Sequence, residues 1–276
     1  MSRRWILLLC LGALPLHAEA QATQITGIMW QLHEKAPEAR GAWHRLGARE
    51  LIIQWVAVDG IAYVNGAGLR ASERMPDWPR IAAEPWAERV IVGLSGRSDE
   101  RQARRSLDAM LAESLAIAQL RFPFRVSGWY FPAEVDPSWR EARDLLPPVL
   151  QRLPRPLWIS AYDNRGIGAR EFADWLGSWL PRDVGVLFQD GVGVHARSAP
   201  VAQEYAQALA DRLGKHRVAV IVEAFRADGG RLRPATASEL KTQLSAYRSF
   251  PLYLFDGPHY VSESVVEELR APAKPR

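Results

Sequence analysis

Eight short apolar runs alternate with longer amphipathic stretches along this chain, and this alternation limits the folds open to it more than any other feature. The runs cover residues 25–30, 51–58, 90–94, 126–130, 157–161, 184–189, 218–223 and 252–255. The stretches with helical spacing of apolar residues cover 38–46, 78–87, 100–119, 138–150, 169–179, 200–213, 238–247 and 261–269. Runs that are apolar almost throughout are typical of parallel strands buried on both faces. Eight alternating strand–helix units predict a closed (β/α)8 barrel, the TIM barrel, in a single domain, with an open doubly wound sheet as the alternative.

The first twenty residues have the composition of a secretory signal peptide. Arg3 and Arg4 give a positive start, residues 5–16 are apolar, and Ala18-Glu19-Ala20 matches the small-residue pattern of a cleavage site. An uncleaved membrane anchor is the alternative, but about twelve apolar residues are too few to span a bilayer. We therefore expect a signal peptide at 1–20 cleaved after Ala20, a barrel domain at 21–270 and a disordered tail at 271–276. The mature protein would be periplasmic or secreted, with no stable membrane anchor.

Composition argues against several classes of chemistry. Cys10 is the single cysteine and lies in the predicted signal peptide, so the mature chain would have no disulfide and no thiolate ligand. The histidines are scattered without an H-x-H or H-E-x-x-H motif, and none of the four lysines ends a predicted strand. We therefore expect no metal, no Schiff base and no cofactor. The formal net charge is +4 without a dense basic run, which argues against nucleic acid as a partner.

Carboxylates and aromatic rings gather at the predicted strand ends, where the loops of a (β/α)8 barrel form its active site. Six of the eight ends carry a carboxylate: Asp59, Glu134, Asp163, Asp190, Glu223 and Asp256. Near them stand the rings of Trp30, Trp55, Trp129, Tyr130, Trp158, Tyr162, Phe188, Phe225 and Tyr253. Carboxylates accept hydrogen bonds from sugar hydroxyls, and flat rings stack on the apolar faces of pyranoses. Together they indicate a carbohydrate site.

Cleavage of a glycosidic bond needs two carboxyl groups, one to protonate the leaving oxygen and one to attack or to activate water. Glu134 and Glu223 follow or end the fourth and seventh predicted strands. This placement resembles the clan A barrel glycosidases, sometimes called the four–seven superfamily. The resemblance implies that Glu134 is the acid/base and Glu223 the nucleophile of a retaining enzyme. On chemistry alone Asp163 or Asp190 could replace either one, and any strand-end carboxylate could instead cap a helix or pair with an arginine.

Several motifs together resemble the barrel family named domain of unknown function 4434, which is described as a family of candidate glycosyl hydrolases. They are Gly27-Ile28-Met29-Trp30-Gln31, Leu46-Gly47 before Leu51-Ile52-Ile53-Gln54-Trp55, Gly128-Trp129-Tyr130-Phe131-Pro132-Ala133-Glu134, and Phe188-Gln189-Asp190-Gly191-Val192-Gly193. Ile159-Ser160-Ala161-Tyr162 fits less well, because a proline is expected where Ala161 stands. The resemblance spans about 25–256 and implies that Gln31, Gln54, Trp55, Glu134, Gln189 and Asp190 line a binding face.

These observations lead to the hypothesis of an exported glycoside hydrolase that acts on a polysaccharide, either an exopolysaccharide or a cell-wall glycan. Glu134 and Glu223 would be catalytic. The substrate would be bound by Trp30, Gln31, Gln54, Trp55, Trp129, Tyr130, Trp158, Tyr162, Asp163, Gln189, Asp190, Tyr253 and Asp256. The main alternative is a non-catalytic glycan-binding barrel that assists polysaccharide secretion or assembly. A structural protein with a merely polar barrel face is the third hypothesis.

Overall fold

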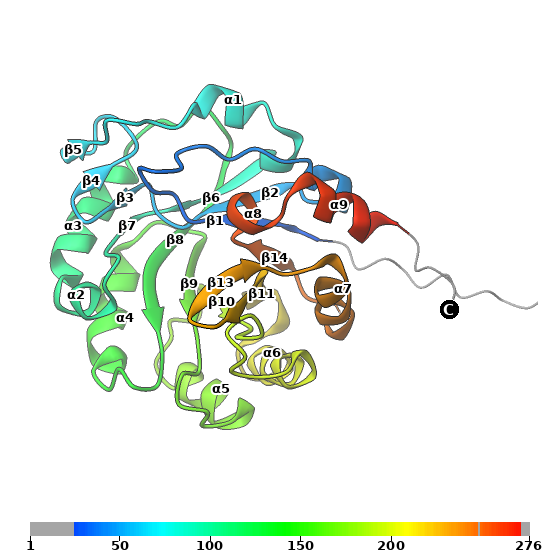
Figure 1. The fold of residues 1–276 in the computed structure, drawn as a ribbon. Helices are drawn as coiled ribbons and strands as arrows, with labels where there is room; N and C mark the ends of the chain where they lie inside the picture. Colours follow the sequence, from blue (N-terminus) through cyan, green and yellow to red (C-terminus); the bar gives the residue numbers. More distant parts are fainter. Residues whose placement is uncertain (1–24, 248, 272–276) are drawn as a thin grey trace, which may run out of the picture.

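The computed structural model describes residues 25–247 and 249–271. In this part of the chain eight parallel strands close into a barrel in the order β1-β14-β11-β10-β9-β8-β6-β2 (Figure 1). They are β1 (Gly27–Trp30), β2 (Glu50–Ile53), β6 (Arg89–Gly93), β8 (Val126–Val135), β9 (Leu157–Ala161), β10 (Val184–Gln189), β11 (Val218–Glu223) and β14 (Leu252–Phe255). Because β1 pairs with both β2 and β14, the sheet is closed. The predicted (β/α)8 barrel is confirmed, whereas the predicted signal peptide lies outside the described residues.

Side chains of the barrel strands alternate between the inside of the barrel and the space under the helices. The inner cluster consists of Met29, Ile52, Ile91, Tyr130, Leu187, Ala219, Ile221 and Tyr253. Their neighbours in sequence, such as Ile28 and Ile53, belong to a second buried cluster outside the barrel. Both faces of each strand are therefore buried, which explains the continuous apolar runs. Because side chains alternate with a period of two, the residues two positions after Met29, Ile52 and Leu187 also point inward, at the carboxyl ends of their strands.

Helices surround the barrel unevenly, with α3 to α7 around the strands in Figure 1. The helices are η1 (Trp43–Leu46), α1 (Trp78–Ala82), η2 (Pro85–Ala87), α2 (Glu100–Arg105), α3 (Leu107–Ile117), α4 (Ala142–Arg152), α5 (Ala169–Gly177), α6 (Ala199–Leu213), η3 (Lys215–Arg217), α7 (Ala237–Ala246), α8 (Gly257–Tyr260) and α9 (Glu263–Arg270). Within the described residues, no helix combines the length and apolarity that a membrane span requires.

The first two predicted helices are too long. The stretch 38–46 forms only the 3-10 helix η1, and the stretch 78–87 is divided into α1 and η2. Pro85 opens η2 at the point of this division, where its ring cannot continue a preceding helix. The third predicted helix, 100–119, is also divided, because Ser106 between α2 and α3 has a non-helical backbone.

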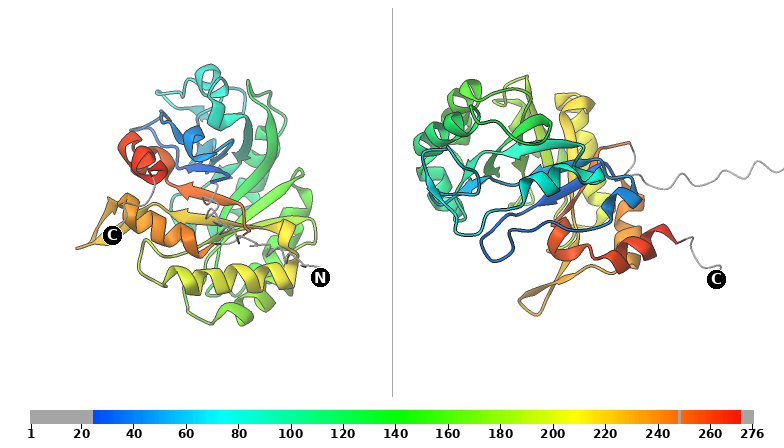
Figure 2. Two further views of the ribbon diagram at one scale, coloured as in Figure 1. Left: turned by 90° about the vertical axis from the view of Figure 1, so that its right-hand side faces the viewer. Right: turned by 90° about the horizontal axis from the view of Figure 1, so that it is seen from above.

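Two small sheets lie outside the barrel and have no counterpart among the predicted strands. β3 (Ala57–Val58), β4 (Ile61–Ala62), β5 (Arg70–Ala71) and β7 (Ser95–Gly96) form one of them. β12 (Phe225–Asp228) and β13 (Arg231–Pro234) form a hairpin that projects from the body of the molecule (Figure 2). The predicted strand 51–58 is wrong in its second half, because β3 leaves the barrel and pairs with β7.

The strand β8 continues beyond its predicted end at Tyr130. Its pairing with β9 shifts register between Phe131 and Val135, which marks an irregularity of the bulge type. Glu134 therefore lies on the extension of a strand, and not in the loop that the sequence predicted. This extension brings its carboxylate to the mouth of the barrel.

Gly93, at the end of β6, is a position where two strands approach too closely for a side chain. An added Cβ would lie 2.2 Å from the carbonyl oxygens of Ile53 and Gln54. We predict that Gly93→Ala lowers the free energy of unfolding by about 1–3 kcal/mol, because backbone atoms of two strands must shift. Urea unfolding measures this change.

Gly128→Ala in the neighbouring strand β8 is the matched control. The nearest atom to its added Cβ would be 3.4 Å away, which is ordinary van der Waals contact. We expect a change within about 1 kcal/mol. Equal stability of the two variants would contradict the close approach at Gly93.

Candidate functional site

A cavity of about 180 Å³ lies at the carboxyl ends of the barrel strands, and we call it the mouth cavity. Among the residues predicted to form a site, Gln31, Gln54, Trp55, Tyr130, Glu134 and Gln189 line it. It is also lined by Arg97, Arg104, Trp139, Ser160 and Phe255, which the sequence analysis did not select. Ser160 and Phe255 carried a usable signal, because each stands two residues after an inward-facing ring on its strand.

Three amide side chains reach the mouth cavity from three strands. Gln31 follows β1, Gln54 follows β2 and Gln189 ends β10. In the described part of the chain, Oε1 of Gln54 is buried without a hydrogen-bond partner. Ser160 and Tyr130 share a hydrogen bond of 2.7 Å between their hydroxyl groups. An acceptor buried without a partner costs about 1–3 kcal/mol, so a ligand that donates to Gln54 would recover this free energy.

Glu134 lines the mouth cavity next to these amides, together with Glu100, which is paired with Arg104. The pKa of Glu134 is raised, first by burial and also by the negative charge of Asp136. A hydrogen bond from Gln189 and the positive charge of Arg104 oppose this rise. Burial dominates, so Glu134 keeps its proton to a higher pH than an exposed glutamate does.

The two guanidinium groups of the mouth cavity are already paired with carboxylates. Arg104 forms ion pairs with Glu100 and with Asp136. Arg97 donates to both oxygens of Glu113 at 2.9 Å. Neither arginine offers an uncompensated charge to a ligand, which favours a neutral ligand over an anionic one.

Glu223 ends β11 and is covered by the segment 190–196. Its side chain is 5% exposed, and its Oε2 accepts a hydrogen bond of 3.0 Å from the backbone N–H of Val194. A Cβ at Gly193 would lie 2.8 Å from the Cβ of Glu223, so a side chain there would displace the carboxylate. Burial and the charge of Asp190 raise the pKa of Glu223 to about 7. Glu223 does not belong to the lining of the mouth cavity.

Tyr162 lies near both glutamates. Its pKa is raised by burial and by the charges of Glu223 and Glu134, and lowered by Arg197. The guanidinium of Arg197 lies 5.0 Å from the centroid of the Tyr162 ring. Glu134 near the end of β8 and Glu223 at the end of β11 stand on the same mouth of the barrel, because the barrel strands are parallel.

Asp190 and Asp163 are buried and bonded to the protein. Asp190 is 0% exposed and accepts hydrogen bonds from Gln243 at 2.5 Å and from the hydroxyl of Tyr247 at 2.8 Å. Asp163 accepts a hydrogen bond of 2.7 Å from the hydroxyl of Tyr205. Each aspartate therefore connects a strand end to a helix of the outer layer and does not belong to the lining of the mouth cavity.

Asp256 and Tyr253 are also committed elsewhere. Asp256 is 1% exposed and accepts hydrogen bonds from the backbone N–H of Gln31 and from His259. Tyr253 donates from its hydroxyl to Glu50, the first residue of β2, and so points to the amino ends of the strands. Neither of them belongs to the lining of the mouth cavity.

Three of the four predicted tryptophans do not reach the mouth cavity. Trp30 is fully buried outside the barrel and packs edge-on against Trp78. Trp129 packs against Phe122 in the outer cluster. Trp158 packs in the inner cluster, where an added Cβ at Gly185 would meet its ring. Of the four tryptophans predicted to bind substrate, Trp55 alone lines the cavity.

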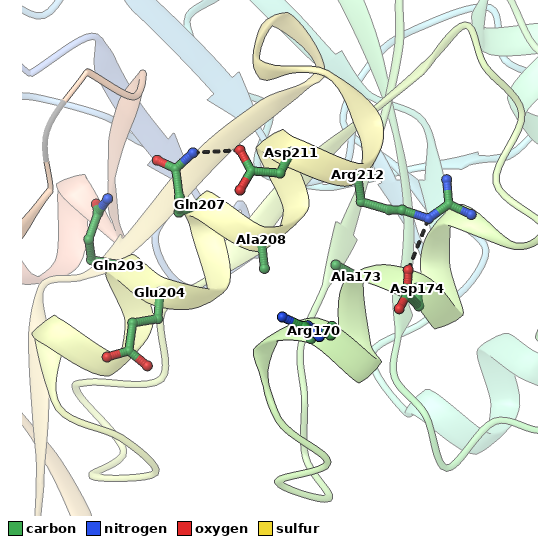
Figure 3. Close-up of a pocket in the computed structure, with 9 residues that line it drawn as sticks. All are labelled: Arg170, Ala173, Asp174, Gln203, Glu204, Gln207, Ala208, Asp211 and Arg212. Carbon is green, nitrogen blue, oxygen red and sulfur yellow. Dashed lines mark hydrogen bonds and ion pairs between the residues drawn. The ribbon is translucent and has the colours of Figure 1, made fainter.

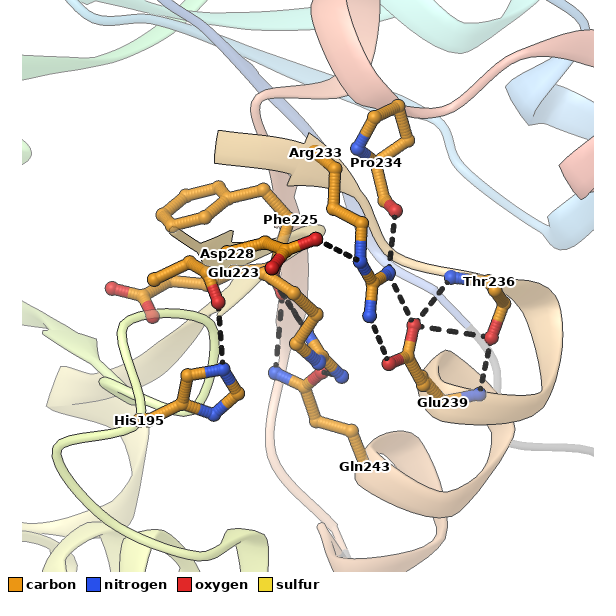
Figure 4. A network of polar contacts seen from close by, with 11 residues as sticks. His195, Glu223, Phe225, Asp228, Arg233, Pro234, Thr236, Glu239 and Gln243 are labelled. Atoms are coloured by element: carbon orange, nitrogen blue, oxygen red, sulfur yellow. Dashed lines mark hydrogen bonds and ion pairs between the residues drawn. The ribbon is translucent and has the colours of Figure 1, made fainter. Parts of the chain in front are cut away.

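A polar network supports the hairpin and α7 behind Glu223 (Figure 4). Arg226 donates to the side-chain oxygen of Gln243 at 2.8 Å and to the backbone carbonyl of Glu223 at 3.2 Å. Arg233 of the hairpin pairs with Glu239 of α7 at 2.7 Å. The backbone around Glu223 is thus held from the helix side as well as from the segment 190–196.

A larger and more open groove of about 710 Å³ lies between α5 and α6, outside the barrel (Figure 3). Four of its polar side chains form two pairs, the 2.7 Å hydrogen bond from Gln207 to Asp211 and the 3.1 Å ion pair of Arg212 with Asp174. No strand-end residue lines it. Its size alone does not make it the candidate site.

The covered carboxyl of Glu223 gives a testable dependence of stability on pH. Its pKa in the folded protein, about 7, lies above its ordinary value of 4.5. The stability that the protonated group contributes is complete below pH ~4.5 and is lost as the pH rises through ~7. We predict that the difference in free energy of unfolding between Glu223→Gln and the wild type shifts in favour of the variant from pH 4 to pH 8. The expected shift is up to about 3 kcal/mol.

Urea unfolding of both proteins at the two pH values measures this effect. Glu141→Gln, an exposed glutamate, is the control and should leave the pH dependence unchanged. A wild type and a Glu223→Gln variant with parallel pH profiles would contradict the raised pKa.

The described residues contain no group of three or more His, Cys, Asp or Glu side chains that could hold a metal ion. No curated protein and no solved structure matches the chain. A family model does match, over residues 41–262, and its description is domain of unknown function (DUF4434). The matched segment covers most of the chain and spans the barrel from η1 to α8. The protein therefore belongs to the DUF4434 family of domains of unknown function.

Proposed function

We propose that the protein is an exported glycoside hydrolase that acts on a polysaccharide, an exopolysaccharide or a cell-wall glycan, at the mouth cavity. One observation supports this best. Glu134, a carboxyl group with a raised pKa, stands in a cavity whose other polar groups are mainly amides and hydroxyls. A general acid needs such a pKa in order to hold its proton near neutral pH.

The polar lining suits the recognition of sugar hydroxyls. Each hydroxyl both donates and accepts, and each glutamine side chain offers an oxygen acceptor and an N–H donor. Oε1 of Gln54 is an acceptor without a protein partner, and Trp55 supplies a ring beside it. The volume of about 180 Å³ is below the ~300 Å³ at the lower end of typical ligand pockets, which suits one sugar ring better than a chain segment.

In the proposed reaction, protonated Glu134 donates its proton to the glycosidic oxygen as the bond from this oxygen to the anomeric carbon breaks. A second carboxylate attacks the anomeric carbon or activates the water that does so. Glu223, on the seventh strand of the barrel, is the candidate because of its strand position. Since it is 5% exposed under the segment 190–196, this segment must move before Glu223 can react.

A non-catalytic glycan-binding barrel that assists polysaccharide secretion or assembly is the second candidate. The state of Glu223 favours it, because a nucleophile must be accessible and ionised, and burial opposes both. A binding protein needs the amides of the mouth cavity but no second carboxylate.

The variant Glu134→Gln separates the two candidates. The amide keeps the shape of the side chain but cannot donate the proton, so we predict a fall in turnover of about 10²-fold or more with glycan affinity almost unchanged. Reducing ends released from a panel of glycans measure turnover, and calorimetry measures affinity.

Glu141→Gln is the control for this experiment, because Glu141 is exposed. Full activity of Glu134→Gln would remove Glu134 from the mechanism. If the wild type binds a glycan of the panel but releases no reducing ends from any of them, this result would support the binding protein instead.

The unpartnered oxygen of Gln54 allows a separate test of the binding site. We predict that Gln54→Leu weakens glycan binding about tenfold, which is about 1.4 kcal/mol, because a donor on the ligand loses its acceptor. The free energy of unfolding should not fall, since a buried acceptor without a partner is removed. Gln119→Leu, at an exposed position, is the control. Equal loss of stability and affinity would indicate a structural role for Gln54.

A further inference from the structure

Two histidines outside the proposed chemistry face each other at the seam of the barrel, where the first strand β1 pairs with the last strand β14. His33 lies just after β1, and His259 lies in α8, just after β14. Their Nε2 atoms are 3.1 Å apart, and their rings are stacked at 8° with centroids 5.1 Å apart. His259 also bonds through Nδ1 to the buried carboxylate of Asp256 at 2.5 Å.

The hydrogen bonds around the pair permit one arrangement of protons when both rings are neutral. The backbone N–H of Lys35 donates to Nδ1 of His33 at 3.2 Å, so the proton of His33 is on Nε2. His33 then donates to Nε2 of His259, and the proton of His259 must be on Nδ1, from which it donates to Asp256. The chain of bonds runs in one direction from the 31–36 segment to Asp256.

We propose that His33, His259 and Asp256 form a pH-sensitive latch that holds the segment 31–36 against the segment 256–260 and releases it when the histidine pair takes up protons from the solvent. This inference does not depend on the proposed function.

The first proton rearranges the hydrogen bonds within the segment 31–36 but keeps the contact between the two histidines, which becomes charge-assisted. It enters at His259, whose pKa is raised chiefly by its hydrogen bond to Asp256. Both nitrogens of His259 are then donors, so His33 must accept through Nε2 and carry its own proton on Nδ1. There the proton faces the N–H of Lys35, and that hydrogen bond is lost.

The second proton breaks the latch. With both rings charged, N–H groups oppose each other across the 3.1 Å contact between the two Nε2 atoms. The pKa of His33 is accordingly lowered, first by burial and then by His259. The second proton therefore enters below the ordinary histidine range, and the stacked contact cannot survive it.

The other charged groups near the pair do not replace the contact between His33 and His259. Lys35 adds a positive charge that also disfavours protonation of His33, and Tyr260 of α8 lies near Asp256. Across the segment, Glu34 accepts a hydrogen bond from Ser72, and Arg74 donates to the carbonyl oxygen of Lys35. These two bonds tie the segment to residues 72–74, which follow β5, so release from Asp256 need not unfold it.

The latch is connected to the mouth cavity through Gln31. Its backbone N–H donates to the same oxygen of Asp256 that His259 uses, at 2.9 Å, and its side chain lines the cavity. Opening of the latch would therefore move one wall of the cavity. Acidic pH would alter the mouth through this residue.

A metal site is the competing explanation, because a carboxylate behind a histidine is also a common arrangement behind metal ligands. The geometry disfavours it. Nε2 of His33 carries a proton in the neutral pair, and the described residues bring no third ligand to the site.

Nitrogen-15 NMR of the histidine rings in the whole chain without residues 1–20 tests the latch. We expect the Nδ1–H form of His259 and the Nε2–H form of His33 at about pH 8, with two separate titrations, one above and one below the ordinary value of ~6.5. Two rings that titrate together near ~6.5, or His259 in the Nε2–H form, would overturn the proposal.

Hydrogen exchange tests the release. We expect protection of the Gln31 and Lys35 amides, corrected for intrinsic rates, to fall about tenfold or more between about pH 8 and about pH 5. In His33→Gln this pH dependence should be lost, while His216→Gln, at an exposed histidine, should retain it. Unchanged protection in the wild type would overturn the latch. Zinc is then added in stoichiometric amount at neutral pH. A shift of the nitrogen-15 signals of both rings would favour the metal site instead.

Discussion

Each barrel strand fills two hydrophobic cores, one inside the barrel and one under the helices, and the site depends on this double burial. Met29 and Ile221 face inward, while Ile28 and Val222 face outward. The same alternation continues to the strand ends, so a residue points into the mouth or toward the helices according to its position in the period of two. Ser160, Gln189 and Phe255 reach the mouth as members of the inward-facing set, two positions after Trp158, Leu187 and Tyr253.

The neighbouring set of residues explains why so many strand-end carboxylates are buried. Asp190 follows Gln189 and points to α7, where Gln243 and Tyr247 bind it. Its negative charge in turn helps to raise the pKa of Glu223. A carboxylate that anchors a helix thus influences the protonation of a candidate catalytic group on the next strand.

The sequence was sufficient to predict the eight strands, because continuous apolar runs are a direct consequence of double burial. Gln31 and Glu134 were selected from their places after predicted strands and Gln54 from the family resemblance, and all three line the mouth cavity. The sequence could not predict the small sheets, since the strands of one have two residues each and β12 and β13 of the other contain no apolar run. Nor could it separate aromatic residues such as Trp30 that pack under the helices from those that face the mouth, because strand registers and ends were uncertain by a residue or more. Arg104 and Trp139 reach the cavity from outside the strands and gave no sequence signal.

The protonation of the two glutamates limits how a hydrolase could work here. Hydrolysis needs one protonated and one ionised carboxyl group, whereas burial raises the pKa of both Glu134 and Glu223. The resemblance to clan A glycosidases implies that Glu223 is the nucleophile. With the segment 190–196 closed, Glu223 has a pKa of about 7 and no access to the mouth cavity. Movement of this segment would hydrate the carboxylate and lower its pKa, because burial is the main cause of the rise. A hydrolase of this structure would therefore generate its nucleophile only when substrate binding displaces Val194 and Gly193 from Glu223.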